Sequence, residues 1–161
     1  MILIALGANL PSSAGPPAAT LKAALSQLEE RGIKILAVSS FYETPAWPDP
    51  AEPAFINAVA AIQTALPPAQ LLALLHNVEA DFGRVRSLPN APRSLDLDLL
   101  DYDGLVTGEG LALPHPRMTE RAFVLVPMAE IAPGWRHPVT GMGVTDLLTA
   151  LPDGGGVKKL A

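Results

Sequence analysis

The chain has 161 residues, of which 49% are hydrophobic and 17% are charged, and its formal net charge is −5. Such a composition is typical of one globular domain, here residues 1–161, and excludes a disordered chain. The acidic charge argues against general nucleic-acid binding, and the absence of cysteine excludes disulfides and thiolate metal sites. No apolar run reaches the ~20 residues of a membrane span, so we expect a cytoplasmic protein.

The first part of the chain alternates strand and helix patterns. Residues 1–6 are a short apolar run ended by Gly7, which predicts a buried strand. Leucines at helical spacing predict a helix over 17–31, and apolar and β-branched residues predict a second strand over 33–42.

A proline-rich segment separates these elements from the next strand. Residues 43–53 hold four prolines in eleven residues, which predicts a surface loop because proline cannot donate to a sheet ladder. A third strand is predicted over 55–64, with one face made by Phe55, Asn57, Val59 and Ala61. Pro67 and Pro68 then suit the first turn of a helix that runs to about Phe82.

The stretch over 92–100 alternates leucine with aspartate, and this period of two predicts a strand. Asp96 and Asp98 then share one face, with Cα atoms roughly 6.5 Å apart, and Leu97 points to the other. Two carboxylates this close repel each other unless a cation lies between them, and Mg²⁺ favours such oxygen ligands together with substrate phosphate. The alternative is an ordinary strand with an acidic polar face. Asp101 falls on the opposite parity and is interpreted as a strand-end residue.

After this strand the pattern becomes irregular. Residues 104–106 are predicted to add a short hairpin partner, and short helices are predicted over 122–131 and 144–151, before a glycine-rich tail. The order of elements is then β-α-β-β-α-β with a C-terminal helical addition. This is the order of the ferredoxin-like α+β fold, an antiparallel sheet with helices on one face.

Basic residues gather in one part of this acidic chain. Five of the seven arginines lie between positions 84 and 121, where no lysine occurs: Arg84, Arg86, Arg93, Arg117 and Arg121. We expect them to hold an anion, with scattered surface arginines as the alternative. His115, between two prolines, is a candidate for phosphate binding or proton transfer, although a lone loop histidine is more often structural. Together with the acidic pair, these residues favour metal-assisted phosphoryl transfer.

Several segments closely match the signature of the 6-hydroxymethyl-7,8-dihydropterin pyrophosphokinases. The central match is the APRSLDLDLL stretch over residues 91–100. Further matches follow in family order at 5–10, 39–45, 55–58, 83–86, 114–118 and 121–123. The chain therefore resembles this family, and the resemblance implies a ferredoxin-like, monomeric enzyme of folate biosynthesis. It would move the β,γ-pyrophosphoryl group of ATP onto the hydroxymethyl group of a reduced pterin and release AMP.

The resemblance also implies which residues meet ATP. Asp96 and Asp98 would hold two Mg²⁺ ions that bridge the phosphates and the attacking hydroxyl. Arg84 and Arg93 would contact the phosphates and stabilise the transfer. The other residues implied to bind ATP are Glu79, His115 and Arg121. In the loop that carries Arg84 and Arg93, Asn90 and Ala91 stand where some relatives have Trp-Gly, so its closure over ATP is expected to be weaker or to use different contacts.

The same resemblance implies how the pterin is bound. Its ring would stack between Phe55 and Phe123, an arrangement that suits flat heterocycles, and its polar edge would be read by Asn57 and by the backbone near Thr44 and Pro45. Two other functions stay open from the residues alone. One is a ferredoxin-like module that binds a small molecule without chemistry, and the other is an ordinary kinase that transfers only the γ-phosphoryl group.

Overall fold

The computed structural model describes residues 1–46, 50–83, 94–108, 110–152 and 156–160. Within these ranges, six strands form one sheet, and every pairing in it is antiparallel. The strand order is β5 (Asp96–Tyr102), β1 (Ile2–Ala8), β4 (Phe55–Gln63), β3 (Tyr42–Thr44) and β6 (Lys158–Lys159). The sixth strand, β2 (Lys34–Val38), pairs with the far end of β4.

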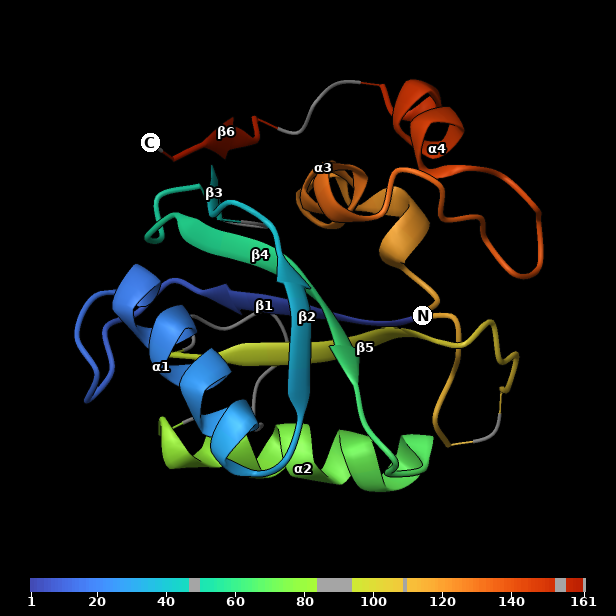
Figure 1. Cartoon of the computed structure of the whole chain (residues 1–161). Coiled ribbons are helices and arrows are strands. Elements are labelled where there is room, and N and C mark those ends of the chain that lie inside the picture. The colour runs from blue at the N-terminus through green and yellow to red at the C-terminus, as the bar shows by residue number, and fades with distance from the viewer. Residues whose placement is uncertain (47–49, 84–93, 109, 153–155, 161) are drawn as a thin grey trace.

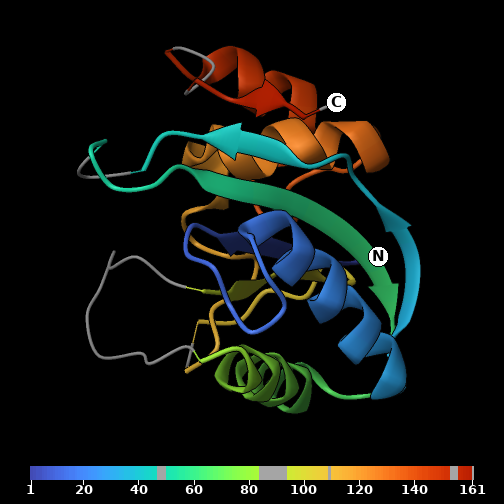
Figure 2. The ribbon, with the colours of Figure 1, turned by 90° about the vertical axis from the view of Figure 1, so that its left-hand side faces the viewer.

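Helices cover both faces of this sheet, as Figures 1 and 2 show from two directions. The helices α1 (Pro17–Glu30) and α2 (Pro68–Asp81) lie on one face. The helix α3 (Ala122–Ile131), preceded by the short 3-10 helix η1 (Met118–Glu120), lies on the opposite face, and α4 (Val144–Ala150) packs on it. The predicted α+β fold is confirmed, and the C-terminal addition covers the face that the first two helices leave open.

Each face of the sheet has its own hydrophobic core, because side chains alternate along the central strands. Toward α1 and α2, Leu97 and Leu99 of β5 and Leu95 just before it are buried, and they meet the leucine stripes of both helices. Toward α3, the buried side chains include Leu3 of β1, Val59 of β4, and Leu125 and Met128 of α3. The alternation therefore directs Asp96 and Asp98 to the α3 side, and the two share the face opposite Leu97, as the sequence predicts.

The predicted strand over 33–42 is wrong in one respect, because two strands, β2 and β3, occupy this stretch. Between them, the Ser39 hydroxyl accepts a hydrogen bond from the Val59 backbone N–H at 3.0 Å, while the Ser39 N–H donates to the Val59 carbonyl at 2.9 Å. A side-chain oxygen thus replaces a backbone carbonyl in the ladder with β4. The chain can then turn toward the far end of β4 without leaving a buried backbone group unpaired.

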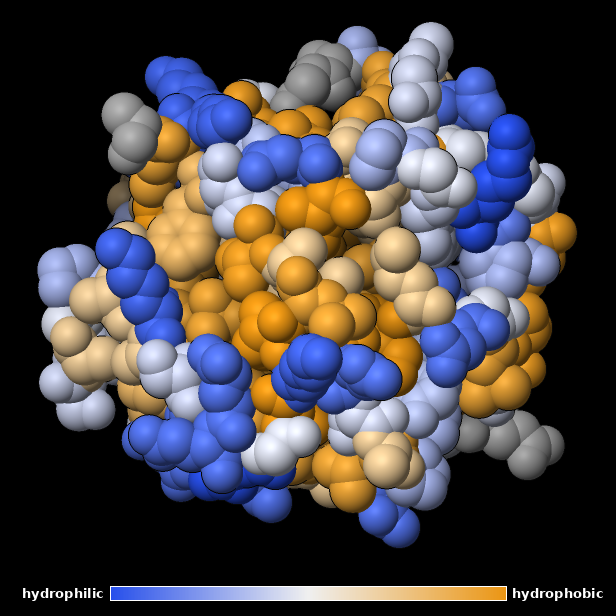
Figure 3. Space-filling view, viewed as in Figure 1, coloured by the Kyte–Doolittle hydropathy of each residue, from blue (hydrophilic) through white to orange (hydrophobic). Residues whose placement is uncertain are grey.

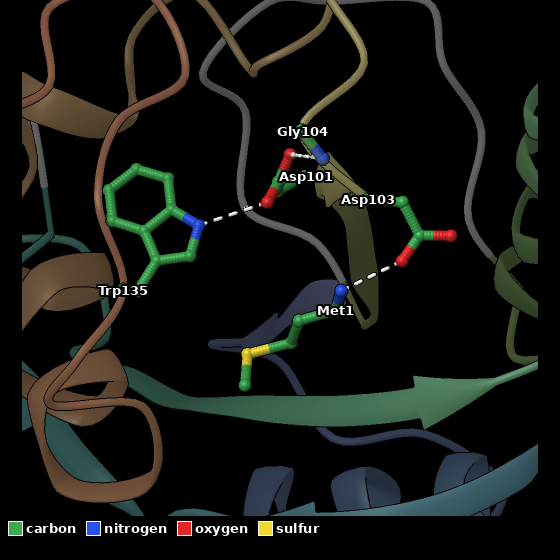
Figure 4. Close-up of polar contacts among 5 residues, drawn as sticks. All are labelled: Met1, Asp101, Asp103, Gly104 and Trp135. Atoms are coloured by element: carbon green, nitrogen blue, oxygen red, sulfur yellow. Dashed lines mark hydrogen bonds and ion pairs between the residues drawn. The ribbon is translucent and has the colours of Figure 1, made fainter.

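The interpretation of Asp101 by parity is also wrong, because β5 contains a bulge. Leu3 pairs with Asp101 whereas Ile4 pairs with Leu99, so Leu100 is an extra residue and the alternation shifts there. Asp101 consequently points to the α3 side, where it is 3% exposed and accepts a hydrogen bond from Trp135 Nε1 at 2.9 Å. Figure 4 shows this contact, which joins the segment after α3 to the edge of the sheet.

Two expectations for the end of the chain need correction. Residues 104–106 form no strand, because Asp103 and Gly104 both have positive φ and turn the chain away from β5. The glycine-rich tail, in contrast, ends in β6, which pairs with β3 through Tyr42↔Lys159 and Glu43↔Lys158. A two-residue strand with two lysines carries no apolar alternation, so the sequence pattern gave no signal for it.

Apolar side chains gather at the centre of the face that carries α1 and β2, with hydrophilic side chains around them (Figure 3). Leu36 of β2 is the residue that departs from the register with β4, and its side chain is 55% exposed. In the part of the chain that the structure describes, no helix combines the length and the apolar character needed to cross a membrane.

Candidate active site

A cavity of about 510 Å³ lies on the α3 side of the sheet. The central strands, the η1–α3 segment and the chain just after α4 form its walls. The residues predicted for the site that line it are Thr44, Pro45, Phe55, Asn57, Asp96, Asp98, Arg121 and Phe123. Glu79 and His115 do not line it, and Arg84 and Arg93 lie outside the described residues.

The acidic pair sits at one end of this cavity. In the sheet register, Asp98 lies opposite Ala5 and Asp96 lies opposite Gly7, and all four of these residues line the cavity. The small side chains of β1 leave space beside the carboxylates, so a ligand can approach them from within the cavity.

Arg121 lies between the acidic end and the aromatic end. Its Nη1 is 3.8 Å from Asp98 Oδ2, and its Cζ is 5.5 Å from the centroid of the Phe123 ring, over the ring face. Its side chain is 26% exposed, so the guanidinium is held but still faces the cavity. A cation in this place can offset carboxylate charge or bind a phosphate oxygen, for which its planar fork is well suited.

His115 stands beside the acidic end and is neutral at ordinary pH. Burial is the largest cause that lowers its pKa, to about 4, and the positive charges of Arg121 and Arg117 lower it further against the opposing effect of Asp96. Its Nδ1 accepts a hydrogen bond from the Arg117 backbone N–H at 3.2 Å. The neutral ring therefore presents Nε2–H as a hydrogen-bond donor, with no positive charge.

Glu79 belongs to the opposite side of the sheet. Its side chain is 1% exposed, and its Oε2 accepts a hydrogen bond from the Leu97 backbone N–H at 2.7 Å. The structure thus places Glu79 at the outer edge of β5, between α2 and the strand, and its predicted contact with ATP stays a prediction. A sequence signal for this placement exists, because Glu79 follows Leu75 by four residues and lies on the buried face of α2.

At the other end of the cavity, two polar side chains are fixed to each other. Asn57 Nδ2 donates to Thr44 Oγ1 at 2.8 Å, and each residue is 5% exposed. The register that pairs β3 with β4 sets Thr44 directly opposite Phe55 and brings it next to Asn57. A carboxamide and a hydroxyl in these positions can donate to and accept from the polar edge of a flat ring.

Gly7 allows Asn57 to adopt this position. A Cβ atom on Gly7 would lie 2.9 Å from Asn57 Oδ1 and 4.0 Å from Phe55 Cδ1. The predicted strand ended before Gly7, but β1 continues through it to Ala8, so this glycine is part of the cavity floor and not a strand terminator. Its role is close approach of the backbone to a side chain.

Several lining residues were missed by the sequence analysis. Glu120 reaches the cavity from the segment before α3, and Leu151 and Pro152 reach it from the chain after α4. Arg117, one of the arginines expected to hold an anion, also lines the cavity, close in sequence to Glu120. Leu151 and Pro152 carry no chemical signature, and only the packing of α4 on α3 brings them to the cavity.

The acidic pair fits a Mg²⁺ complex of ATP by its donor chemistry. Asp96 and Asp98 offer hard carboxylate oxygens on one wall of the cavity. Within the described ranges, no group of three or more His, Cys, Asp or Glu residues could hold a metal. Mg²⁺ commonly takes only one or two protein carboxylates and completes its octahedron with water and substrate phosphate, so two carboxylates facing an open cavity suffice.

Comparisons with known proteins show the family of this chain. Residues 3–133 match the model of the family described as 7,8-dihydro-6-hydroxymethylpterin-pyrophosphokinase (HPPK). The 2-amino-4-hydroxy-6-hydroxymethyldihydropteridine pyrophosphokinase of Methylorubrum extorquens is 46% identical over 127 residues, which cover 78% of this chain and 80% of that protein. The folic acid synthesis protein fol1 of Pneumocystis carinii is 37% identical over 94% of this chain, but the chain spans only 20% of its length.

A solved structure shows the same fold. The wild-type HPPK-DHPS of Plasmodium falciparum superposes with a TM-score of 0.71 and 14% identity, over 92% of this chain and 40% of that one. At this identity the likeness concerns the fold alone, but the family match and the identity to the bacterial relative concern the sequence itself. The chain belongs to the 7,8-dihydro-6-hydroxymethylpterin-pyrophosphokinase family.

Proposed function

We propose that the cavity is where this chain carries out the reaction of its family, with the acidic pair at the phosphate end and Asn57 at the pterin end. The reaction transfers pyrophosphate from ATP to 6-hydroxymethyl-7,8-dihydropterin in folate biosynthesis. The observation that carries the placement is the cavity itself, which joins Asp96 and Asp98 to Phe55, Asn57 and Phe123 in one space.

The chemistry requires charge neutralisation more than a protein nucleophile. The hydroxymethyl oxygen of the pterin forms a bond to the β-phosphorus of ATP. The bond from that phosphorus to the oxygen shared with the α-phosphate breaks, AMP leaves with this oxygen, and the hydroxyl proton is released. Mg²⁺, when bound, offsets the charge that the phosphate oxygens carry in the transition state.

At the phosphate end, Asp96 and Asp98 would hold the metal and Arg121 would turn from Asp98 to a phosphate oxygen once the metal takes that carboxylate. The neutral ring of His115 would donate a hydrogen bond to ATP. Arg84 and Arg93, which the sequence predicts to contact the phosphates, lie outside the described residues and keep that predicted role.

At the pterin end, Phe55 and Phe123 would hold the ring by stacking. Asn57 and Thr44, together with the backbone at Pro45, would bind its polar edge. The hydrogen bond between Asn57 and Thr44 supports this assignment, because it fixes which atoms of the carboxamide face the ring.

Finer properties of the enzyme belong to the same proposal. We expect two Mg²⁺ ions, a monomer and a cytoplasmic location, with no nucleic-acid or membrane partner. The chain would act as one domain over residues 1–161, and the pairing of β6 near its end with β3 supports this.

The experiment mixes protein, MgATP and 6-hydroxymethyl-7,8-dihydropterin and separates the adenine nucleotides by chromatography. AMP formed only when pterin is present, and reduced at least about 10³-fold in Asp98→Ala, supports the proposal. The matched control is Asp103→Ala, which removes a 61% exposed carboxylate just beyond the same strand. ADP in place of AMP would indicate an ordinary kinase, and binding without either product would indicate a non-catalytic module.

A further inference from the structure

Leu97 lies in β5 between the two aspartates of the phosphate end, but its side chain points to the opposite face of the sheet. It is the residue between Asp96 and Asp98, so its backbone torsion angles set the direction of both carboxylates relative to each other. Its side chain is fully buried between the sheet and the first two helices. Whatever holds the Leu97 backbone therefore also holds the geometry of the acidic pair.

The Leu97 backbone N–H donates to a carboxylate. The acceptor is Glu79 Oε2 at 2.7 Å, a distance typical of a charge-assisted hydrogen bond. β5 is the last strand of the sheet and pairs only with β1 among the described strands, so α2 supports its outer side. A second hydrogen bond, from Ser94 Oγ to the Phe82 carbonyl, joins the same two elements near the start of β5.

A carboxylate in this position needs a reason. Glu79 is 1% exposed and sits on the apolar stripe of α2 next to Val78 and four residues after Leu75. Burying a carboxylate is unfavourable unless hydrogen bonds compensate for the lost water. An apolar residue here would continue the stripe at a smaller penalty, but it would not accept the Leu97 N–H.

We infer that Glu79 is a positioning residue that holds the backbone between Asp96 and Asp98 in the geometry that binds the metal–ATP complex. Mg²⁺ tolerates little departure from octahedral geometry, and two like charges on one strand face tend to move apart. A fixed hydrogen bond at the outer edge of the strand resists that movement. This inference rests on the proposed function only in taking Asp96 and Asp98 as the metal ligands.

Two variants separate the hydrogen bond from the charge. Glu79→Gln keeps an oxygen acceptor at the same reach but is neutral. Glu79→Asp keeps the charge but is one methylene shorter, which withdraws the carboxylate from Leu97. Val78→Ala is the structural control, because it leaves a cavity in the same helix face without touching the Leu97 N–H.

The first readout is binding of the Mn²⁺ complex of α,β-methylene-ATP, in which the bond that breaks during transfer is replaced. We expect Glu79→Asp to lower its affinity by about 10- to 100-fold, and Glu79→Gln and Val78→Ala to change it by less than about threefold. The second readout is amide hydrogen exchange at Leu97, which should accelerate by about tenfold in Glu79→Asp and stay near wild type in Glu79→Gln.

Either of two results would overturn the inference. Wild-type affinity for the complex in Glu79→Asp, with faster exchange at Leu97, would show that the acidic pair does not depend on this bond. An equally deep loss in Glu79→Gln would assign the effect to the negative charge. Both readouts are independent of turnover, so an enzyme that makes no AMP would count against the proposed function without deciding the role of Glu79.

Discussion

At one end of the cavity, Asn57 and Thr44 are each 5% exposed and hydrogen-bond to each other at 2.8 Å. At the other end, Asp98 keeps 28% of its side chain exposed, and Arg121 stands 3.8 Å from it, beyond ordinary hydrogen-bond distance. The pterin end is thus completed by the protein alone. The phosphate end presents charges of both signs to the cavity, and a metal–ATP complex would reorganise them.

This difference is the one expected from the two ligands proposed for these ends. A neutral ring gains affinity from a rigid, matching surface, because few groups need to be ordered when it binds. A triphosphate with its metal gains affinity mainly from charge, and a site of fixed, desolvated carboxylates would be strongly unfavourable before the ion arrives. The carboxylates at the phosphate end are partly exposed, and the hydrogen bond from the Leu97 N–H to Glu79 holds the backbone between them.

The difference between the two ends of the cavity can be tested first by a substitution at Asn57. Asn57→Ala removes the group that faces both Thr44 and the cavity, so we expect the KM for pterin to rise by about 10- to 100-fold, as the loss of one or two buried hydrogen bonds implies. The affinity for MgATP should change by less than about threefold. Steady-state kinetics with each substrate varied in turn measures both. If the KM values for both substrates rose together, the two ends would not be independent.

A smaller effect is expected from Gly7→Ala. The new methyl group would lie 2.9 Å from Asn57 Oδ1, so Asn57 must move, and we expect a free energy of unfolding lower by about 1–3 kcal/mol. We also expect a pterin KM raised by about tenfold. Gly134→Ala is the matched control, because nothing lies within 4 Å of its Cβ position. Equal thermal stability and equal pterin KM in the two variants would refute the close-approach role of Gly7.

The strand faces that carry Asn57 and the acidic pair could both be predicted from the sequence. Alternation over Asp96–Leu99 and over Phe55–Ala61 needs only the period of a strand, and both faces are confirmed. The bulge at Leu100 could not be predicted this way, because an extra residue leaves the composition unchanged and shifts the parity of Asp101.

The sequence also could not predict contacts between segments that lie far apart along the chain. The hydrogen bond from Leu97 to Glu79 joins elements separated along the chain by residues 82–95, and Leu151 reaches the cavity only through helix packing. Neither involves a local propensity. The family resemblance supplied the identity of many lining residues, but it gave no signal for the buried contact of Glu79 with the Leu97 backbone.

The smallest expected effect concerns His115 at the phosphate end, and it is a change in how stability depends on pH. Burial, then Arg121 and Arg117, lower its pKa to about 4 from the ordinary value of 6.5, so between these values the unfolded chain binds the proton that the folded protein excludes. Stability therefore falls as pH decreases from about 6.5 toward 4. After allowance for solvent screening, His115 should lower the free energy of unfolding by an amount on the order of 1 kcal/mol between pH 7 and pH 5.

Urea unfolding at both pH values measures this effect of His115. The His115→Gln variant is expected to lose less stability than wild type over the same interval. His137→Gln serves as the control, since His137 lies in an exposed loop away from the cavity and its Nδ1 accepts backbone N–H groups. A wild-type pH dependence in His115→Gln would mean that the folded protein and the unfolded chain protonate this ring over the same pH range. The phosphate end would then gain a positive charge already as the pH falls through about 6.5, and not only near pH 4.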